Sequence, residues 1–212
     1  MEALNLPSGR INNPSERLIS FCESEYAYYD AIPSADHNHI QPLDVLVTVA
    51  MNSYVNDSVK VRRVHQGLAA NCDHLLLSLP EDASLIELDR WREPLRELLH
   101  AAVQAQLVLI PVATKVLHRK RRALIPMLDN VVLNHYLNTD THRSLLSGTQ
   151  DKRRAAEAAM TALDLLRTDL VSGERAIAGL RAVVDAHGFE LTSVRILELL
   201  VWMEVEPAGY YR

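Results

Sequence analysis

Apolar residues recur at intervals of three and four along most of the chain, which is the period of an amphipathic helix. The clearest case is the segment 151–171, whose charged positions lie opposite an apolar stripe. That stripe consists of Ala155, Ala159, Ala162, Leu163, Leu166 and Leu170. Similar stripes follow Pro14, Asp57, Gly173 and Thr192. No stretch of useful length alternates as a strand would, so the pattern predicts an all-α fold of about eight or nine helices.

Two segments depart from this amphipathic pattern. Residues 1–12, which contain Pro7 and Gly9, predict a loose lead-in to the first helix. The segment Leu43–Ser53 is apolar on nearly every side. A helix without a polar face belongs in the middle of a core, so we expect this segment to be central.

The length of 212 residues suits a single compact helical domain covering 1–212. Pro80, Glu81 and Asp82 mark a turn, which makes residues 80–84 the best candidate for a boundary between two helical lobes. Hydrophobic residues make up 48% of the chain and charged residues 23%, a composition typical of globular proteins.

The formal net charge of −5 argues against a protein that coats nucleic acid over its whole surface, but permits a local basic patch. Cys22 and Cys72 are too few for a disulfide framework and predict buried, reduced thiols. No signal pattern and no membrane-spanning run is found, which predicts a cytoplasmic protein without a membrane partner. The sequence carries no cofactor fingerprint. Asp36, His37 and His39 lack a second ligand group at a recognisable spacing, so we predict no metal site.

The stretch from Leu109 to Leu137 carries the strongest functional signal, because a dense group of cations lies between two apolar helical runs. One interpretation is a solvated turn that pairs with acidic side chains. The other is a local patch that contacts the phosphates of DNA or RNA. The predicted nucleic-acid-binding residues are Lys115, His118, Arg119, Lys120, Arg121 and Arg122.

Asp129 follows this group, in or near the first turn of a helix that we expect to begin near Pro126. A carboxylate in that position is stabilised by the unpaired N–H groups and the helix dipole. Its structural role would be that of a helix-end cap. Its functional role would be that of a catalytic carboxylate beside the basic group.

A short helix, an Arg/Lys-rich turn and then L-I-P-x-x-D at the start of another helix resembles the "domain of unknown function" family 6308. Over this segment that family is similar to the helix-hairpin-helix DNA glycosylase superfamily. The resemblance implies that Thr114 and Lys115 lie in the helix after the hairpin, and that Asp129 matches the catalytic aspartate. Leu109–Ala113 stand where glycosylases have the glycines that allow close approach to a phosphate.

Three functions follow as hypotheses. The first is a non-enzymatic nucleic-acid-associated protein on a degenerate helix-hairpin-helix glycosylase-like scaffold. The second is a homodimeric protein-interaction module in which the basic turn meets an acidic surface. The third is a base-excision glycosylase that uses Asp129.

Overall fold

The computed structural model describes residues 2–51, 53–137 and 152–205, and these residues are mainly helical, as the sequence predicts. The N-terminal part contains β1 (Ala3–Leu6), β2 (Gly9–Asn12), α1 (Pro14–Glu25), the short 3-10 helix η1 (Tyr26–Tyr28), α2 (Pro42–Leu46) and the 3-10 helix η2 (Val47–Met51). The middle part contains α3 (Ser58–Leu76), η3 (Leu85–Glu87), α4 (Leu88–Gln104), α5 (Ile110–His118) and α6 (Asn130–Tyr136). The C-terminal part contains α8 (Lys152–Ser172), α9 (Glu174–Ala186) and α10 (Ser193–Val205).

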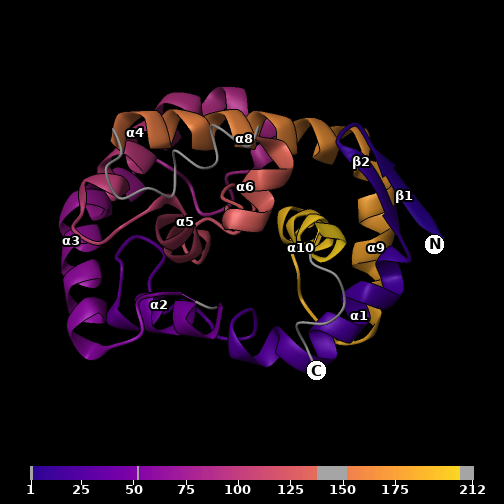
Figure 1. Cartoon of the computed structure of the whole chain (residues 1–212), viewed down its shortest axis with the longest axis horizontal. Coiled ribbons are helices and arrows are strands. Elements are labelled where there is room, and N and C mark those ends of the chain that lie inside the picture. Colours follow the sequence, from indigo (N-terminus) through magenta and orange to yellow (C-terminus); the bar gives the residue numbers. More distant parts are fainter. Residues whose placement is uncertain (1, 52, 138–151, 206–212) are drawn as a thin grey trace.

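Figure 1 shows two groups of elements joined by the long helix α8. The helices α2, α3, α4 and α5 lie on one side, and α1, α9 and the β-hairpin lie on the other. α8 packs along α4 and also contacts α6, α9 and α10. One continuous hydrophobic core runs through both groups, from Leu4 in the hairpin to Leu98 in α4 and Val201 in α10. The predicted lobe boundary near 80–84 stays a prediction, although α3 and α4 on either side of it pack against each other.

The helix starts follow the local chemistry that the sequence suggested. Pro14 opens α1, where its missing N–H has no intrahelical partner. Asp57 caps α3 by accepting the backbone N–H of Lys60 at 2.8 Å. Both Cys22 and Cys72 are buried free thiols, which confirms their predicted state.

The predicted loose lead-in over residues 1–12 is wrong, because β1 and β2 form an antiparallel hairpin there. Leu4 pairs with Ile11, and both side chains are buried in the main core. Each strand is only four residues long, which is too short for strand alternation to stand out in the sequence.

The predicted central helix over 43–53 is also wrong. The segment divides into the short α2 and the 3-10 helix η2, and it lies at the edge of the molecule (Figure 1). Leu43, Leu46 and Val49 are exposed, whereas Val45 and Val47 are buried. Apolar side chains on all sides of this segment therefore do not mean that it is fully buried: one face packs in the protein and the other exposes apolar side chains to solvent.

Candidate functional site

The four consecutive cations Arg119–Arg122, here called the basic run, follow the end of α5 and enter the protein interior. The side chains of Arg119 and Lys120 are fully buried and form ion pairs with the buried carboxylate of Asp44 at the start of α2. Arg119 donates through Nε to Asp44 Oδ1 at 2.9 Å. Lys120 donates to the other oxygen of Asp44 and to the carbonyl of Asp36, the latter at 2.7 Å.

Arg121 is 1% exposed and donates mainly to backbone carbonyls. Its Nε lies 2.6 Å from the oxygen of Leu79, and one of its terminal nitrogens lies 2.5 Å from the oxygen of Leu76. These carbonyls belong to the end of α3 and the turn after it. A buried guanidinium at that position complements the helix dipole, and at Leu76 it shares the carbonyl oxygen with the backbone N–H of Leu79.

Arg119, Lys120 and Arg121 are therefore buried rather than solvated, and they contact the protein's own acid and carbonyl groups; the pairing with acidic side chains is found at Asp44. Arg122 is half-buried and donates to the carbonyls of Asp30 and Ile32. His118 is buried beside the run, and its ring donates through Nδ1 to Ile125. Burial lowers the pKa of His118 to about 3, so its ring is uncharged at neutral pH.

Asp129 is the N-cap of α6, as its structural interpretation predicted. Its Oδ1 accepts the backbone N–H groups of Val131 at 2.9 Å and Val132 at 3.0 Å. The helix begins at Asn130 rather than near Pro126, because residues 125–129 run through the core without regular secondary structure. This segment brings the half-buried Asp129 to the start of α6.

Asp129 also lines a narrow pocket together with Lys115 of α5 and Glu198 of α10, here called the acid–lysine pocket. Its remaining walls include apolar side chains from α1, η2 and α10, namely Phe21, Met51, Leu199 and Trp202, together with Met127 and Arg195. The free volume is about 20 Å³, which is room for about one water molecule. The pocket thus joins three ionisable side chains from separate elements around a small free space.

Hydrogen bonds from neighbouring elements hold the chain around this pocket. Tyr29 donates its hydroxyl to the carbonyl of Lys115 at 2.6 Å. Thr114 accepts the N–H of Leu128 at 3.0 Å. Glu198 accepts the N–H of Met127 at 2.6 Å. The backbone that leads into Asp129 is therefore fixed from both α5 and α10.

Burial shifts the pKa values of two side chains of the pocket, Lys115 and Glu198. Burial lowers the pKa of Lys115, and the negative charge of Asp129 partly offsets this effect. The Lys115 ammonium donates to the carbonyl of Met51 at 2.5 Å. Burial raises the pKa of Glu198 to about 7, against the opposing influence of Arg195. Carboxylates and lysines with shifted pKa values in a pocket are typical of functional sites.

An ion cluster lies behind Glu198, and the sequence did not identify its members. Arg195 is buried and contacts both oxygens of Asp30, at 2.9 and 3.0 Å. Another of its nitrogens lies 2.5 Å from Glu198. One feature of the sequence could have indicated this cluster: Arg195 and Glu198 lie three residues apart inside the apolar run of α10, where unpaired charges are not expected.

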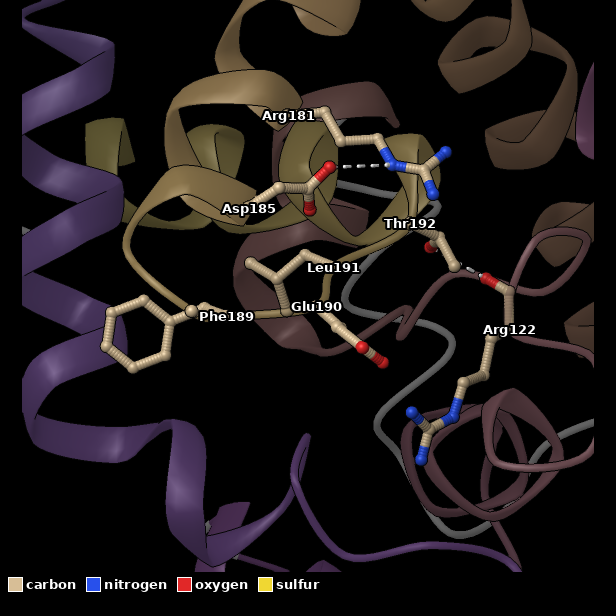
Figure 2. A pocket seen from close by; sticks show the side chains of 8 residues that line it. Arg122, Arg181, Asp185, Phe189, Glu190, Leu191 and Thr192 are labelled. Atoms are coloured by element: carbon tan, nitrogen blue, oxygen red, sulfur yellow. Dashed lines mark hydrogen bonds and ion pairs between the residues drawn. The ribbon is translucent and has the colours of Figure 1, made fainter.

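A second, open basin of about 600 Å³ lies where α9 turns toward α10 (Figure 2). Arg181 forms an ion pair with Asp185 there at 3.9 Å. Thr192 donates its hydroxyl to the carbonyl of Arg122 at 3.1 Å. Arg122 carries its guanidinium group away from Thr192 and Arg181 (Figure 2). The two arginines do not converge on one point, so we assign no anion site to this basin.

Within residues 2–51, 53–137 and 152–205, no group of three or more His, Cys, Asp or Glu side chains is arranged to hold a metal ion. Asp36 and His39 are paired with each other at 2.8 Å. None of the helices in the described part of the chain is long and apolar enough to cross a membrane.

Comparison with known proteins gave one finding. The model of the family of unknown function DUF6308 matches residues 20–205. No curated protein and no solved structure matches significantly.

Proposed function

The chain belongs to the family of unknown function DUF6308, and from its site we propose that it acts on a glycosidic bond of a nucleic acid through the acid–lysine pocket. The observation that carries this proposal is the convergence of Lys115, Asp129 and Glu198 on one pocket. The glycosylase-like segment supports it, because that resemblance independently matches Asp129 to the catalytic aspartate.

In the proposed reaction, the bond between C1′ of the sugar and the base nitrogen breaks, and the base leaves with the bonding electrons. Positive charge then develops on the sugar, and the carboxylate of Asp129 stabilises it. A water molecule adds its oxygen to C1′ and loses a proton, while the base takes up a proton. Glu198, whose pKa is raised to about 7, is the candidate proton carrier. Its two oxygens accept from Met127 and Arg195, so it must release one of these hydrogen bonds to take up a proton.

The pocket must open for this chemistry, since about 20 Å³ does not accommodate a nucleobase. Met51 is the wall best suited to move, because its unbranched thioether chain adapts its shape more readily than an aromatic ring and is partly exposed, whereas the other methionine, Met127, is buried against Arg195. We therefore expect Met51→Ala to raise the proposed activity, since the truncation enlarges the pocket and keeps the carbonyl that binds Lys115.

The test compares the native protein with Asp129→Asn on single- and double-stranded oligonucleotides that contain uracil, alkylated bases or oxidised bases. Asparagine caps a helix about as well as aspartate, so the variant removes the charge and retains the cap. We expect the rate of base release to fall roughly 10²- to 10⁴-fold. Asp57→Asn, which changes the cap of α3 in the same way, is the matched control and should keep the native rate. Equal rates for native protein and Asp129→Asn, or no base release by either, would contradict the proposal.

Non-catalytic nucleic-acid binding through Lys115, His118, Arg119, Lys120, Arg121 and Arg122 stays a prediction. The burial of all of these side chains except the half-buried Arg122 leaves few donors for phosphates. Binding that falls steeply with rising salt would support it. Homodimerisation also stays a prediction, and light scattering across a salt series would test it.

A further inference from the structure

The wall that Met51 contributes to the acid–lysine pocket belongs to the 3-10 helix η2. The chain is anchored on both sides of η2, because Val45 and Val55 are fully buried in the main hydrophobic core. The apolar side chains of η2 lie outside that core. Val47 and Met51 pack in a small separate cluster with Tyr29, Ile32 and Met127. The segment is therefore fixed at both ends and held by fewer apolar contacts between them.

Few polar contacts hold η2 against the rest of the protein. The buried hydroxyl of Thr48 donates to the carbonyl of Val45 at 2.7 Å, which is a bond within the same segment. Among the residues that the structure describes, one hydrogen bond joins η2 to a distant part of the sequence, and it runs from the ammonium of Lys115 to the carbonyl of Met51 at 2.5 Å. Val49, on the outer side of η2, is 38% exposed. Segments with few buried contacts open locally at a lower free energy than the whole domain.

Lys115 can release the carbonyl of Met51 without becoming an isolated buried charge. The carboxylate of Asp129 lines the same pocket and attracts the ammonium group. A buried cation is costly only where it has no partner of opposite charge. The bond to Met51 can therefore break while the interaction with Asp129 persists.

We propose that η2 is a lid over the acid–lysine pocket and that the hydrogen bond from Lys115 to Met51 is the latch that keeps it closed. Opening moves Val47 and Met51 away from the small cluster, while Val45 and Val55 stay in the core. It also enlarges the free volume beyond the 20 Å³ or so of the closed pocket. The use of this lid to admit a nucleobase rests on the proposed function. Its motion belongs to the protein alone, so the lid can fail its test while base release stands, and the reverse.

Hydrogen exchange of single backbone amides in the native protein, followed by NMR at several urea concentrations below the unfolding transition, measures the opening. The amides of Ala50 and Met51 report on η2, since a 3-10 helix pairs each N–H with the carbonyl three residues earlier. Those of Val116 and Leu117, which are buried in α5, report on global unfolding. After correction for intrinsic rates, we expect the η2 amides to exchange at least roughly 100-fold faster, with little dependence on urea. The same protection and the same urea dependence for both sets would overturn the proposal.

Thiol labelling then tests the latch. Val47→Cys places a thiol on the buried side of η2, where a reagent such as dithionitrobenzoate reaches it only when the lid opens, and the fully buried Cys72 reports on global unfolding. Adding Lys115→Met should raise the labelling rate at position 47 about tenfold or more, because it removes a hydrogen bond from a charged donor. Lys152→Met removes a lysine bond to the carbonyl of Gln104 and is the matched control, which should leave that rate unchanged. Equal rates with and without Lys115→Met, or labelling of position 47 only together with Cys72, would overturn the proposal.

Discussion

Replacing Asp44 with asparagine tests whether a single carboxylate stabilises the burial of Arg119 and Lys120 in the basic run. Asp44 is 1% exposed, and its two oxygens accept from Arg119 and Lys120. Asparagine has nearly the same shape but no charge. The substitution therefore leaves two buried cations facing a neutral amide.

The magnitude follows from the burial of all three groups. Removing one partner of a buried ion pair destabilises a protein by about 3–5 kcal/mol, because the remaining charge stays buried without compensation. Arg119 keeps its bonds to the carbonyls of Ile32 and Pro33, and Lys120 keeps its bond to Asp36, which favours the lower end of that range. A loss of this size is a large part of the roughly 5–15 kcal/mol that stabilises a typical domain.

Urea denaturation followed by circular dichroism measures this loss. Asp57→Asn is the matched control, since its carboxylate caps α3 at the surface, and we expect its free energy of unfolding to stay near the native value. The double variant Asp44→Asn/Lys120→Met removes one of the uncompensated cations, and it should be destabilised by less than the sum of the two single changes. A loss of about 1 kcal/mol or less for Asp44→Asn, as found for exposed ion pairs, would refute the buried arrangement.

Two further predictions concern packing and pH. In Gly67→Ala the new Cβ would lie 2.9 Å from Cβ of Ala105, so the change should lower the free energy of unfolding by about 1–3 kcal/mol despite the better helix propensity of alanine. Gly179 has open space around it, so Gly179→Ala should raise the free energy of unfolding by about 0.5–1 kcal/mol in the same urea assay. His118, with its pKa lowered from its ordinary value to about 3, is protonated in the unfolded chain but not in the folded one between these values. The free energy of unfolding should therefore fall, through His118, by up to about 1.4 kcal/mol per pH unit below about pH 6.5. His118→Gln keeps a donor for the carbonyl of Ile125 and should lack this pH dependence. Identical pH profiles for the native protein and the variant would contradict the prediction.

Most of the helices were predictable from the sequence because an amphipathic helix depends on a local period, whereas the segment 43–53 has no such period and was predicted wrongly. The capping role of Asp129 could be predicted for the same reason, since its partners are the N–H groups two and three residues ahead. The burial of the basic run was not predictable. Arg119 and Lys120 meet Asp44, which lies 75 and 76 positions away, and no local pattern connects them.

The acid–lysine pocket was only partly predictable. Lys115 and Asp129 were named from one segment, but Glu198 reaches the pocket from α10, near the other end of the described chain. Its position depends on the packing of α10 against α6, which the sequence pattern does not specify. The charged pair Arg195 and Glu198 within an apolar run was the local sign that a polar interior group was present.

The central claim is that Arg119, Lys120 and Arg121 are buried. Because they are buried, the candidate functional site is the acid–lysine pocket rather than a cationic surface. Phenylglyoxal modification of the native protein, followed by peptide mass spectrometry, measures the accessibility of each arginine directly. We expect Arg62 and Arg63, which are exposed on α3, to be modified rapidly, while Arg119 and Arg121 react only after denaturation. Modification of Arg119 and Arg121 in the native protein at the rate of Arg62 would contradict the account.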